Sequence, residues 1–115
     1  MKHKAKGRRF KRSTSQRKAL FKHLAEAIIL HEKIKTTTAK AKSLSIFVSK
    51  LITTAKKKNL TAAKSVHSVL SDVPAKKLLN EIAKKYKDRN GGYTRIIKID
   101  ERKGDAAKMS IIEFV

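Results

Sequence analysis

The first regular pattern of apolar and polar residues begins after Ser13. The stretch Ser13-Thr14-Ser15-Gln16 has the form of a capping box, in which Ser and Gln side chains bond reciprocally to backbone N–H groups at a helix start. Apolar positions then recur every three or four residues, which predicts a helix over about residues 14–31. The next apolar face starts at Ala41, after Thr38 as the expected capping residue, and stops at Lys56-Lys57-Lys58-Asn59. A second long helix is therefore predicted between them.

Two shorter helices are predicted after that stop. One covers about residues 61–70, where small and β-branched apolar residues share one side. Another opens at Asp72 and Pro74, residue types that favour the first turn of a helix. We expect this helix to end before Asn90-Gly91-Gly92, since consecutive glycines admit left-handed backbone angles. Its inward positions are Leu78, Leu79, Ile82 and Tyr86.

Three segments have the composition of strands. Residues 33–38 alternate around Ile34, residues 93–99 are rich in β-branched side chains, and residues 109–115 form an apolar run. The polar stretch 100–108 predicts a hairpin loop. The element order is therefore helix, strand, three helices, strand, strand. This α/β (α+β) pattern predicts a two-layer domain with its helices packed on a small mixed sheet.

The chain is strongly basic. Its 115 residues include 30 Lys and Arg against 9 Asp and Glu, which gives a net charge of +21. Self-repulsion on this scale is usually offset by a polyanion, so the charge indicates nucleic acid as the partner. An anionic membrane surface is the alternative, but it needs an apolar helix face rich in Trp, Phe or Leu, and the chain has no Trp. We therefore expect no membrane partner.

Positive charge is most concentrated at the N-terminus, where residues 1–22 hold ten Lys or Arg and no Asp or Glu. Clustered cations neutralise phosphates and release counterions, which gives affinity with little sequence specificity. Residues 1–12 have too few apolar side chains to fold alone, so we expect an extended RNA-binding arm ahead of a single α/β domain over residues 13–115. A solubilising tail and an organellar transit peptide are the alternatives. The arm's candidate RNA contacts are Lys2, His3, Lys4, Lys6, Arg8, Arg9, Lys11 and Arg12.

Three further groups of residues are candidates for RNA contact. The first lies beside the apolar stripe of the first helix, the second surrounds the first strand and the start of the next helix, and the third is the glycine turn before the second strand. The first two would contact phosphates, and the turn would bring backbone amides, a hydroxyl and a guanidinium to a sugar–phosphate surface. A structural turn with its tyrosine packed inward explains the third group equally well. In this order the residues are Arg17, Lys18 and Lys22; Lys35, Lys40 and Lys42; and Gly91, Gly92, Tyr93, Thr94 and Arg95.

No residue pattern indicates catalysis or a cofactor. The chain has no Cys, which excludes disulfides, thiolate metal sites and cysteine nucleophiles. It contains no H-E-x-x-H metal motif, no G-x-S-x-G nucleophile turn and no G-x-x-x-x-G-K phosphate loop. We therefore expect no enzyme activity, no cofactor, no bound metal and no small-molecule substrate.

Short motifs are spread along the chain. They are Met1-Lys2-His3, Gly7-Arg8-Arg9, Arg17 to Leu20, His31 to Thr37 with Lys40-Ala41-Lys42, Gly91 to Ile96, and Gly104-Asp105-Ala106. Over essentially its whole length the chain thereby resembles the family of the bacterial-type large-subunit ribosomal protein seventeen. Gln16 stands where that family often has His, and Lys108 where a Pro is common, so the contacts at these two positions stay open.

This resemblance implies a non-catalytic structural component of the large ribosomal subunit, located in the cytoplasm. It implies contact with large-subunit ribosomal RNA near the peptide exit region and with neighbouring large-subunit proteins, including protein thirty-two. It also implies a mixed helix-and-sheet fold in the element order given above, and it assigns the basic start to the mature protein. From the residues alone, a non-specific DNA-binding or nucleoid-compacting protein is the alternative, because phosphate contacts do not separate RNA from DNA.

Overall fold

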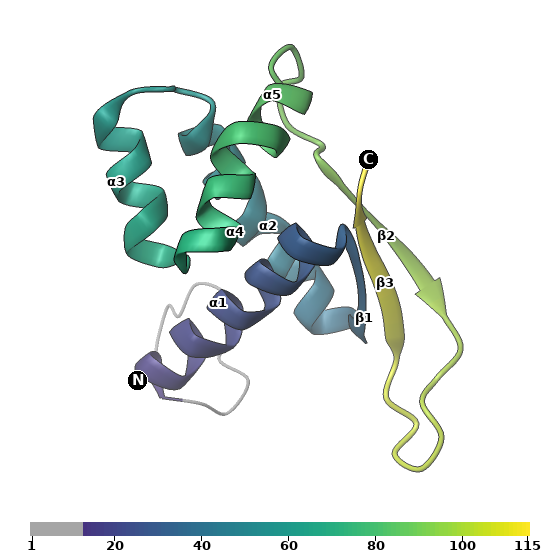
Figure 1. The fold of residues 1–115 in the computed structure, drawn as a ribbon. Coiled ribbons are helices and arrows are strands. Elements are labelled where there is room, and N and C mark those ends of the chain that lie inside the picture. The colour runs from purple at the N-terminus through teal and green to yellow at the C-terminus, as the bar shows by residue number, and fades with distance from the viewer. Residues whose placement is uncertain (1–12) are drawn as a thin grey trace, which may run out of the picture.

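A computed structural model describes residues 13–115, in which the helices lie on one side of a small sheet (Figure 1). The predicted element order and the two-layer α+β class are confirmed. The elements are α1 (Thr14–His31), β1 (Lys33–Thr37), α2 (Thr38–Ala55), α3 (Leu60–Val69), α4 (Asp72–Lys77), the π-helical turn η1 (Leu78–Ile82), α5 (Ala83–Lys85), β2 (Thr94–Ile99) and β3 (Met109–Phe114).

The capping box predicted for α1 is present. The Gln16 backbone N–H donates to Ser13 Oγ at 3.3 Å, and the Ser13 backbone N–H donates to Gln16 Oε1 at 3.1 Å. At the other end Glu32 adopts a left-handed conformation, with φ at 67°, and its N–H donates to the Ile28 carbonyl. Left-handed caps of this kind satisfy carbonyls that the last turn leaves open. The predicted span of 14–31 is confirmed.

The second long helix begins earlier than its apolar pattern indicates. Thr37, not Thr38, caps α2, because its Oγ1 accepts the Lys40 backbone N–H at 3.3 Å. The prediction of Thr38 as the cap is therefore wrong. The helix follows β1 without a loop, so the last extended residue of the strand takes the capping position. The Thr38 hydroxyl instead pairs with Ser110 Oγ on β3 at 2.7 Å.

The remaining helices follow one another around α1 and α2. Asn59, predicted as part of a helix stop, also caps the next helix, since its Oδ1 accepts the Ala62 N–H at 2.7 Å. The helix predicted to open at Asp72 runs without a break through α4, η1 and α5. Its π-helical turn is closed by the Ala83 N–H, which donates to the Leu78 carbonyl five residues back.

The sheet has the order β1-β3-β2, and both pairings are antiparallel. The prediction of a mixed sheet is therefore wrong. β1 and β2 run in the same direction but are not adjacent. The hairpin loop places β3 next to β2, and β1 pairs with the other edge of β3. The parallel pair that a mixed sheet needs is never formed.

The inner face of the sheet completes the core. Across the three strands, Ile34, Ile112 and Ile96 form one row that packs with the helices. Because each buried aliphatic side chain contributes roughly 1.5–3 kcal/mol, this row and the helix interiors supply most of the folding free energy. Within residues 13–115, no helix is long and apolar enough to cross a membrane. The largest fully buried apolar side chains are Ile28, Ile29, Leu44, Ile52, Leu78, Ile112, Val48 and Val66.

Candidate nucleic-acid interface

Acidic residues are unevenly distributed along the fold. Only Glu26 and Glu32 occur before residue 72, and the other seven Asp and Glu are Asp72 and six residues after it. The segment from Lys33 to Ser71, which contains β1, α2 and α3, holds nine Lys and no Asp or Glu. We call it the acid-free segment. Apart from Lys33, which follows Glu32, its lysines lie in a stretch without acids and are the first candidates for phosphate contact.

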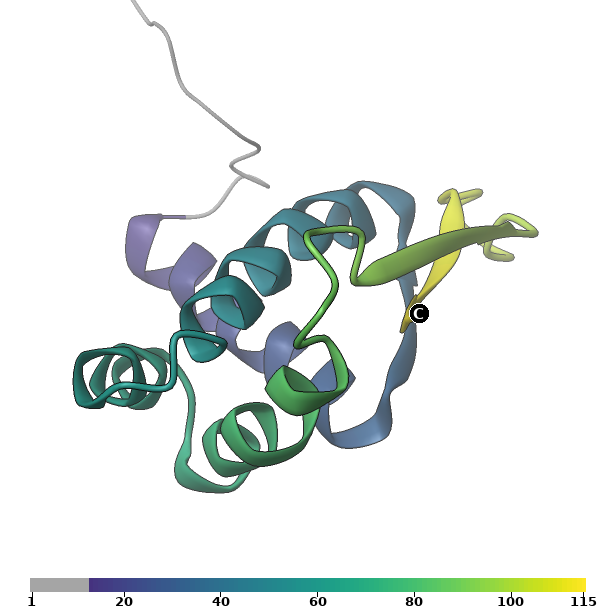
Figure 2. The ribbon, with the colours of Figure 1, turned by 90° about the horizontal axis from the view of Figure 1, so that it is seen from above.

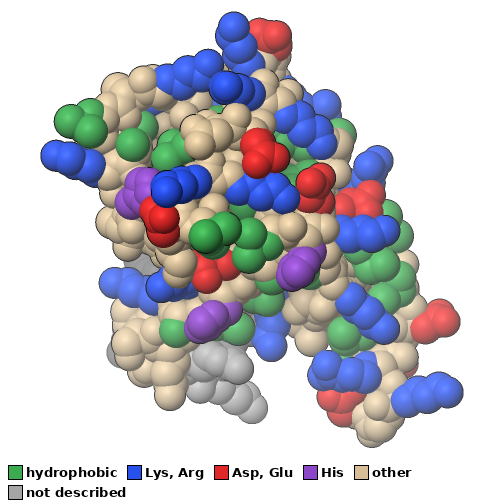
Figure 3. Space-filling view, viewed as in Figure 1, with side chains coloured by type: hydrophobic (Ala, Val, Ile, Leu, Met, Phe, Trp, Pro, Cys, Tyr) green, Lys and Arg blue, Asp and Glu red, His purple; other side chains and the backbone are tan. Residues whose placement is uncertain are grey.

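The face over α4 and the end of α1 has a different character, because acidic and basic side chains alternate on it (Figure 3). Lys76 Nζ lies 3.2 Å from Asp72 Oδ2, and Lys77 Nζ lies 3.5 Å from Glu32 Oε2. Exposed pairs of this kind stabilise a fold by less than about 1 kcal/mol, but they lower the local positive potential. This face is therefore less suited to a polyanion than the acid-free segment.

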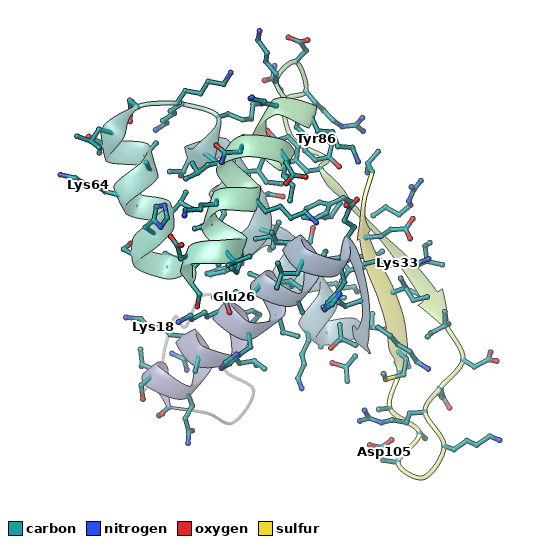
Figure 4. The ribbon with its side chains drawn as sticks, in the orientation of Figure 1. Lys18, Glu26, Lys33, Lys64, Tyr86 and Asp105 are labelled. Carbon is teal, nitrogen blue, oxygen red and sulfur yellow. The ribbon has the colours of Figure 1, made fainter. Side chains whose placement is uncertain are left out.

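Glu26 is the acid in the body of α1, and it links α1 to the start of α4 (Figure 4). Its Oε2 accepts the Ser71 backbone N–H at 2.7 Å. Burial acts to raise the pKa of Glu26, but hydrogen bonds from Ser71 and the charges of Lys22 and His23 outweigh it, so this pKa lies below its usual value. The carboxylate is therefore charged at neutral pH and serves a structural contact.

The structure brings together two of the three basic residues predicted on α1. Lys18 and Lys22 border a groove of about 420 Å³ between α1, α2 and α3, with Lys18 labelled in Figure 4. Arg17 is half-buried, and its Nη2 donates to Thr14 Oγ1 at 3.4 Å. The first turns of α1 thus present cations from a rigid support. The rest of the groove is lined by Ala19, Phe47, Ser68 and Val69.

The lysines predicted around β1 do not form one site. Lys35 is exposed on the outer side of the sheet, where it lines a hollow with Asp100 and Glu101 of the hairpin loop. Lys42 is exposed on α2, and Lys40 is half-buried in the first turn of that helix. Of the three, Lys42 has the surroundings best suited to a phosphate contact.

The glycine turn before β2 is exposed at its tip and anchored at its end. Gly91 and Gly92 have φ angles of 83° and 62°, which favour glycine. Tyr93 is only 2 % exposed, which is the inward packing left open by the sequence. Thr94 Oγ1 lies 2.8 Å from Ser45 Oγ, and Arg95 Nε donates to Glu113 Oε2 at 2.9 Å. Gly91 and Gly92 are exposed, although the Gly92 carbonyl accepts from Arg89 Nε at 3.1 Å.

Lys56 holds this turn in place, a role that the sequence did not reveal. Its Nζ donates to the Arg89 carbonyl at 2.5 Å and to the Tyr93 hydroxyl at 3.0 Å, and it lies 5.2 Å from the centre of the Tyr93 ring. The hydrogen bond from Lys56 is the main reason that the pKa of Tyr93 lies below its usual value. A lysine in a run of three at a helix end has the pattern of a solvated cation, so no local signal marks this contact.

The predicted arm residues lie outside the described part of the chain. For residues 13–115, no group of three or more His, Asp or Glu side chains is arranged to hold a metal ion. The arm residues concerned are Lys2, His3, Lys4, Lys6, Arg8, Arg9, Lys11 and Arg12.

Comparison with known proteins agrees with these features. The family described as Ribosomal protein L17 matches residues 20–115. Over the whole chain, the sequence is 52% identical to large ribosomal subunit protein bL17 of Campylobacter concisus, covering 98% of that protein. It is 51% identical to the bL17 protein of Persephonella marina, covering 95% of it, and 48% identical to that of Aliarcobacter butzleri, covering 100%. The chain therefore belongs to the ribosomal protein L17 family.

Proposed function

We propose that this chain binds large-subunit ribosomal RNA through its basic N-terminal arm and through the cations that continue from it onto α1. As a member of the ribosomal protein L17 family, the chain is a structural constituent of the large ribosomal subunit. The observation that carries the proposal is the charge of residues 1–22, which hold ten Lys or Arg and no acid. Arg17, Lys18 and Lys22 belong to this group and lie on α1.

Binding through these cations is led by phosphates. Each lysine or arginine that contacts a phosphate releases a condensed counterion, so affinity comes from the number of contacts and falls steeply with salt. Such contacts fix the position of a protein on RNA and carry little sequence information. Lys40 and Lys42 extend the basic surface onto α2, and Lys35 onto the edge of the sheet.

The glycine turn makes a different kind of contact in this proposal. Gly91 and Gly92 have no side chain, so the sugar–phosphate backbone can approach the main chain of this turn closely. A Cβ on Gly91 would meet no protein atom within 4 Å, so this space is open to a partner. Tyr93 and Thr94 anchor the end of the turn through the contacts described above, and Arg95 is exposed and paired with Glu113.

The proposal also covers the domain organisation of the chain and its protein partners. Residues 1–12 form the arm and residues 13–115 a single domain that holds its own core. The chain is non-catalytic and needs no cofactor, in keeping with a family of ribosomal structural proteins. Its protein partners are neighbouring large-subunit proteins, including protein thirty-two.

Deletion of residues 1–12 tests the role of the arm. We expect the shortened chain to unfold in one cooperative transition, because the core lies within residues 13–115, and to bind large-subunit ribosomal RNA at least tenfold more weakly, as expected for about seven lost phosphate contacts. Filter binding of the full and shortened chains measures the affinities, and urea unfolding checks the fold. An affinity that barely changes would mean that the arm is a solubilising tail.

A further inference from the structure

α2 has an exposed side that its packing leaves uncovered. One or more side chains from each turn point outward, whereas the side chains on the opposite side of the helix are buried in the core. Ile46 lies in the middle of the exposed side and is 60% exposed. We call this side the α2 outer face, and its exposed residues are Ala39, Lys42, Ile46, Lys50 and Thr53.

The charge of the α2 outer face points to an anionic partner. Lys42 and Lys50 flank Ile46 by one turn on either side, and α2 contains no Asp or Glu. In the described part of the chain, neither lysine has a carboxylate within 4.0 Å, in contrast to the paired lysines on α4. Viewed from above, α2 lies on the opposite side of the molecule from α4 (Figure 2). The mixed-charge face over α4 and the α2 outer face are thus separated by the body of the protein.

The side chains of this face also limit the kind of nucleic acid that fits. No exposed aromatic side chain lies on it, so it lacks the platform on which single-stranded bases stack. Of the side chains that most often read base edges in the major groove of DNA, α2 has Lys but no Arg, Asn or Gln. Between and beyond its lysines the face carries short hydroxyl and aliphatic side chains, which allow the helix backbone to approach a flat surface.

Duplex RNA offers such a surface. Its minor groove is wide and shallow and displays ribose 2′-hydroxyls, whereas the minor groove of B-DNA is about 6 Å wide and too narrow for a helix about 10 Å across. α2 has 18 residues and is about 27 Å long, with Lys42 and Lys50 about 12 Å apart along its axis. Lysines at this separation can contact phosphates on both sides of the groove, with Ile46 against the sugars. The Thr53 hydroxyl donates to the Ser49 carbonyl at 2.9 Å and can accept a hydrogen bond from a 2′-hydroxyl.

We propose that the α2 outer face docks in the shallow minor groove of an RNA duplex and forms a second RNA-binding surface, separate from the arm. This inference rests on the proposed function, since it assumes that the chain binds ribosomal RNA. It adds the structural class of the bound RNA, which phosphate contacts through the arm leave undefined.

Two matched variants of the full chain test the proposal. Ile46→Glu places a negative charge at the centre of the α2 outer face, and Val73→Glu places the same charge on α4, where Val73 is 65% exposed. The probes are an RNA duplex of about two helical turns, the DNA duplex of the same sequence, and large-subunit ribosomal RNA. For the RNA duplex we expect at least a tenfold loss of affinity with Ile46→Glu and less than a twofold loss with Val73→Glu. Thermal unfolding of both variants confirms that they fold.

The probes separate the possible outcomes. Equal effects of the two variants on the RNA duplex would overturn the proposal, and so would an Ile46→Glu effect of the same size on the DNA duplex, because the contact would then depend on phosphates alone. If Ile46→Glu prevented incorporation into ribosomal subunits without weakening RNA binding, a protein would be the partner of this face and the proposal would be wrong. Failure of the unmodified chain to bind ribosomal RNA would instead reject the proposed function itself.

Discussion

The Lys56 ammonium joins the end of α2 to the turn that leads into β2. It donates hydrogen bonds to the Arg89 carbonyl and to the Tyr93 hydroxyl, and Tyr93 packs against the Tyr86 ring with centroids 5.2 Å apart. The Tyr86 hydroxyl in turn donates to the Val115 carbonyl at 2.6 Å. One cation and two phenols thus connect a helix end, the glycine turn and the end of the chain.

Replacing Lys56 by Met should loosen this turn. Because two hydrogen bonds from the charged Lys56 ammonium are lost, we expect the free energy of unfolding, measured by urea denaturation, to fall by about 1–2 kcal/mol. Lys57→Met, a change at the exposed neighbouring lysine, should leave it unchanged. An equal effect of both substitutions would contradict the positioning role of Lys56.

The same variant should raise the pKa of Tyr93 towards its ordinary value of 10.0, since the hydrogen bond from Lys56 is the largest cause of its lowering. A folded-state pKa below the unfolded one stabilises the fold at alkaline pH, and this contribution is lost as the pH falls through the folded-state pKa. The lowered pKa of Tyr93 should therefore make the unmodified chain more stable than Lys56→Met at alkaline pH, in addition to the effect of the lost hydrogen bonds. The ring NMR signal of Tyr93 followed against pH measures the titration.

Among the elements, α1 depends most visibly on a local sequence signal. The Ser13–Gln16 capping box could be predicted because its residues are neighbours in sequence, and the same holds for the apolar stripes of the helices. The direction of strand pairing could not, because it depends on which strand lies between the other two. The Lys56 contact was also out of reach, since its partners lie 33 and 37 residues away. For the candidate site, the sequence identified the basic residues but did not predict which of them lie together in space.

Ser13→Ala should remove the cap of α1. We expect a loss of about 1 kcal/mol in the free energy of unfolding, and faster hydrogen exchange of the amides in the first turn. Ser65→Ala, at an exposed position inside α3, is the control and should be neutral or slightly stabilising, because Ala favours helix interiors. Unchanged exchange in Ser13→Ala would show that other contacts hold the start of α1.

For the molecule as a whole, the distribution of charge divides the surface by function. Among residues 13–115, the lysines of the acid-free segment and of α1 form no ion pair within 4.0 Å, whereas Lys76 and Lys77 on α4 are paired with Asp72 and Glu32. Family membership assigns the chain to the ribosome, and its charge distribution explains how a small protein with a net charge of +21 is accommodated there.

The salt dependence of binding to large-subunit ribosomal RNA tests this account most directly. Each phosphate contact contributes roughly 0.7–0.9 to the slope of log affinity against log salt concentration. We predict a steep negative slope for the unmodified chain, a slope shallower by about one contact for Lys18→Ala on α1, and no change for Lys76→Ala, whose lysine is paired with Asp72. A shallow slope for the unmodified chain, or an equal change in both variants, would contradict binding led by phosphate contacts from residues 1–22.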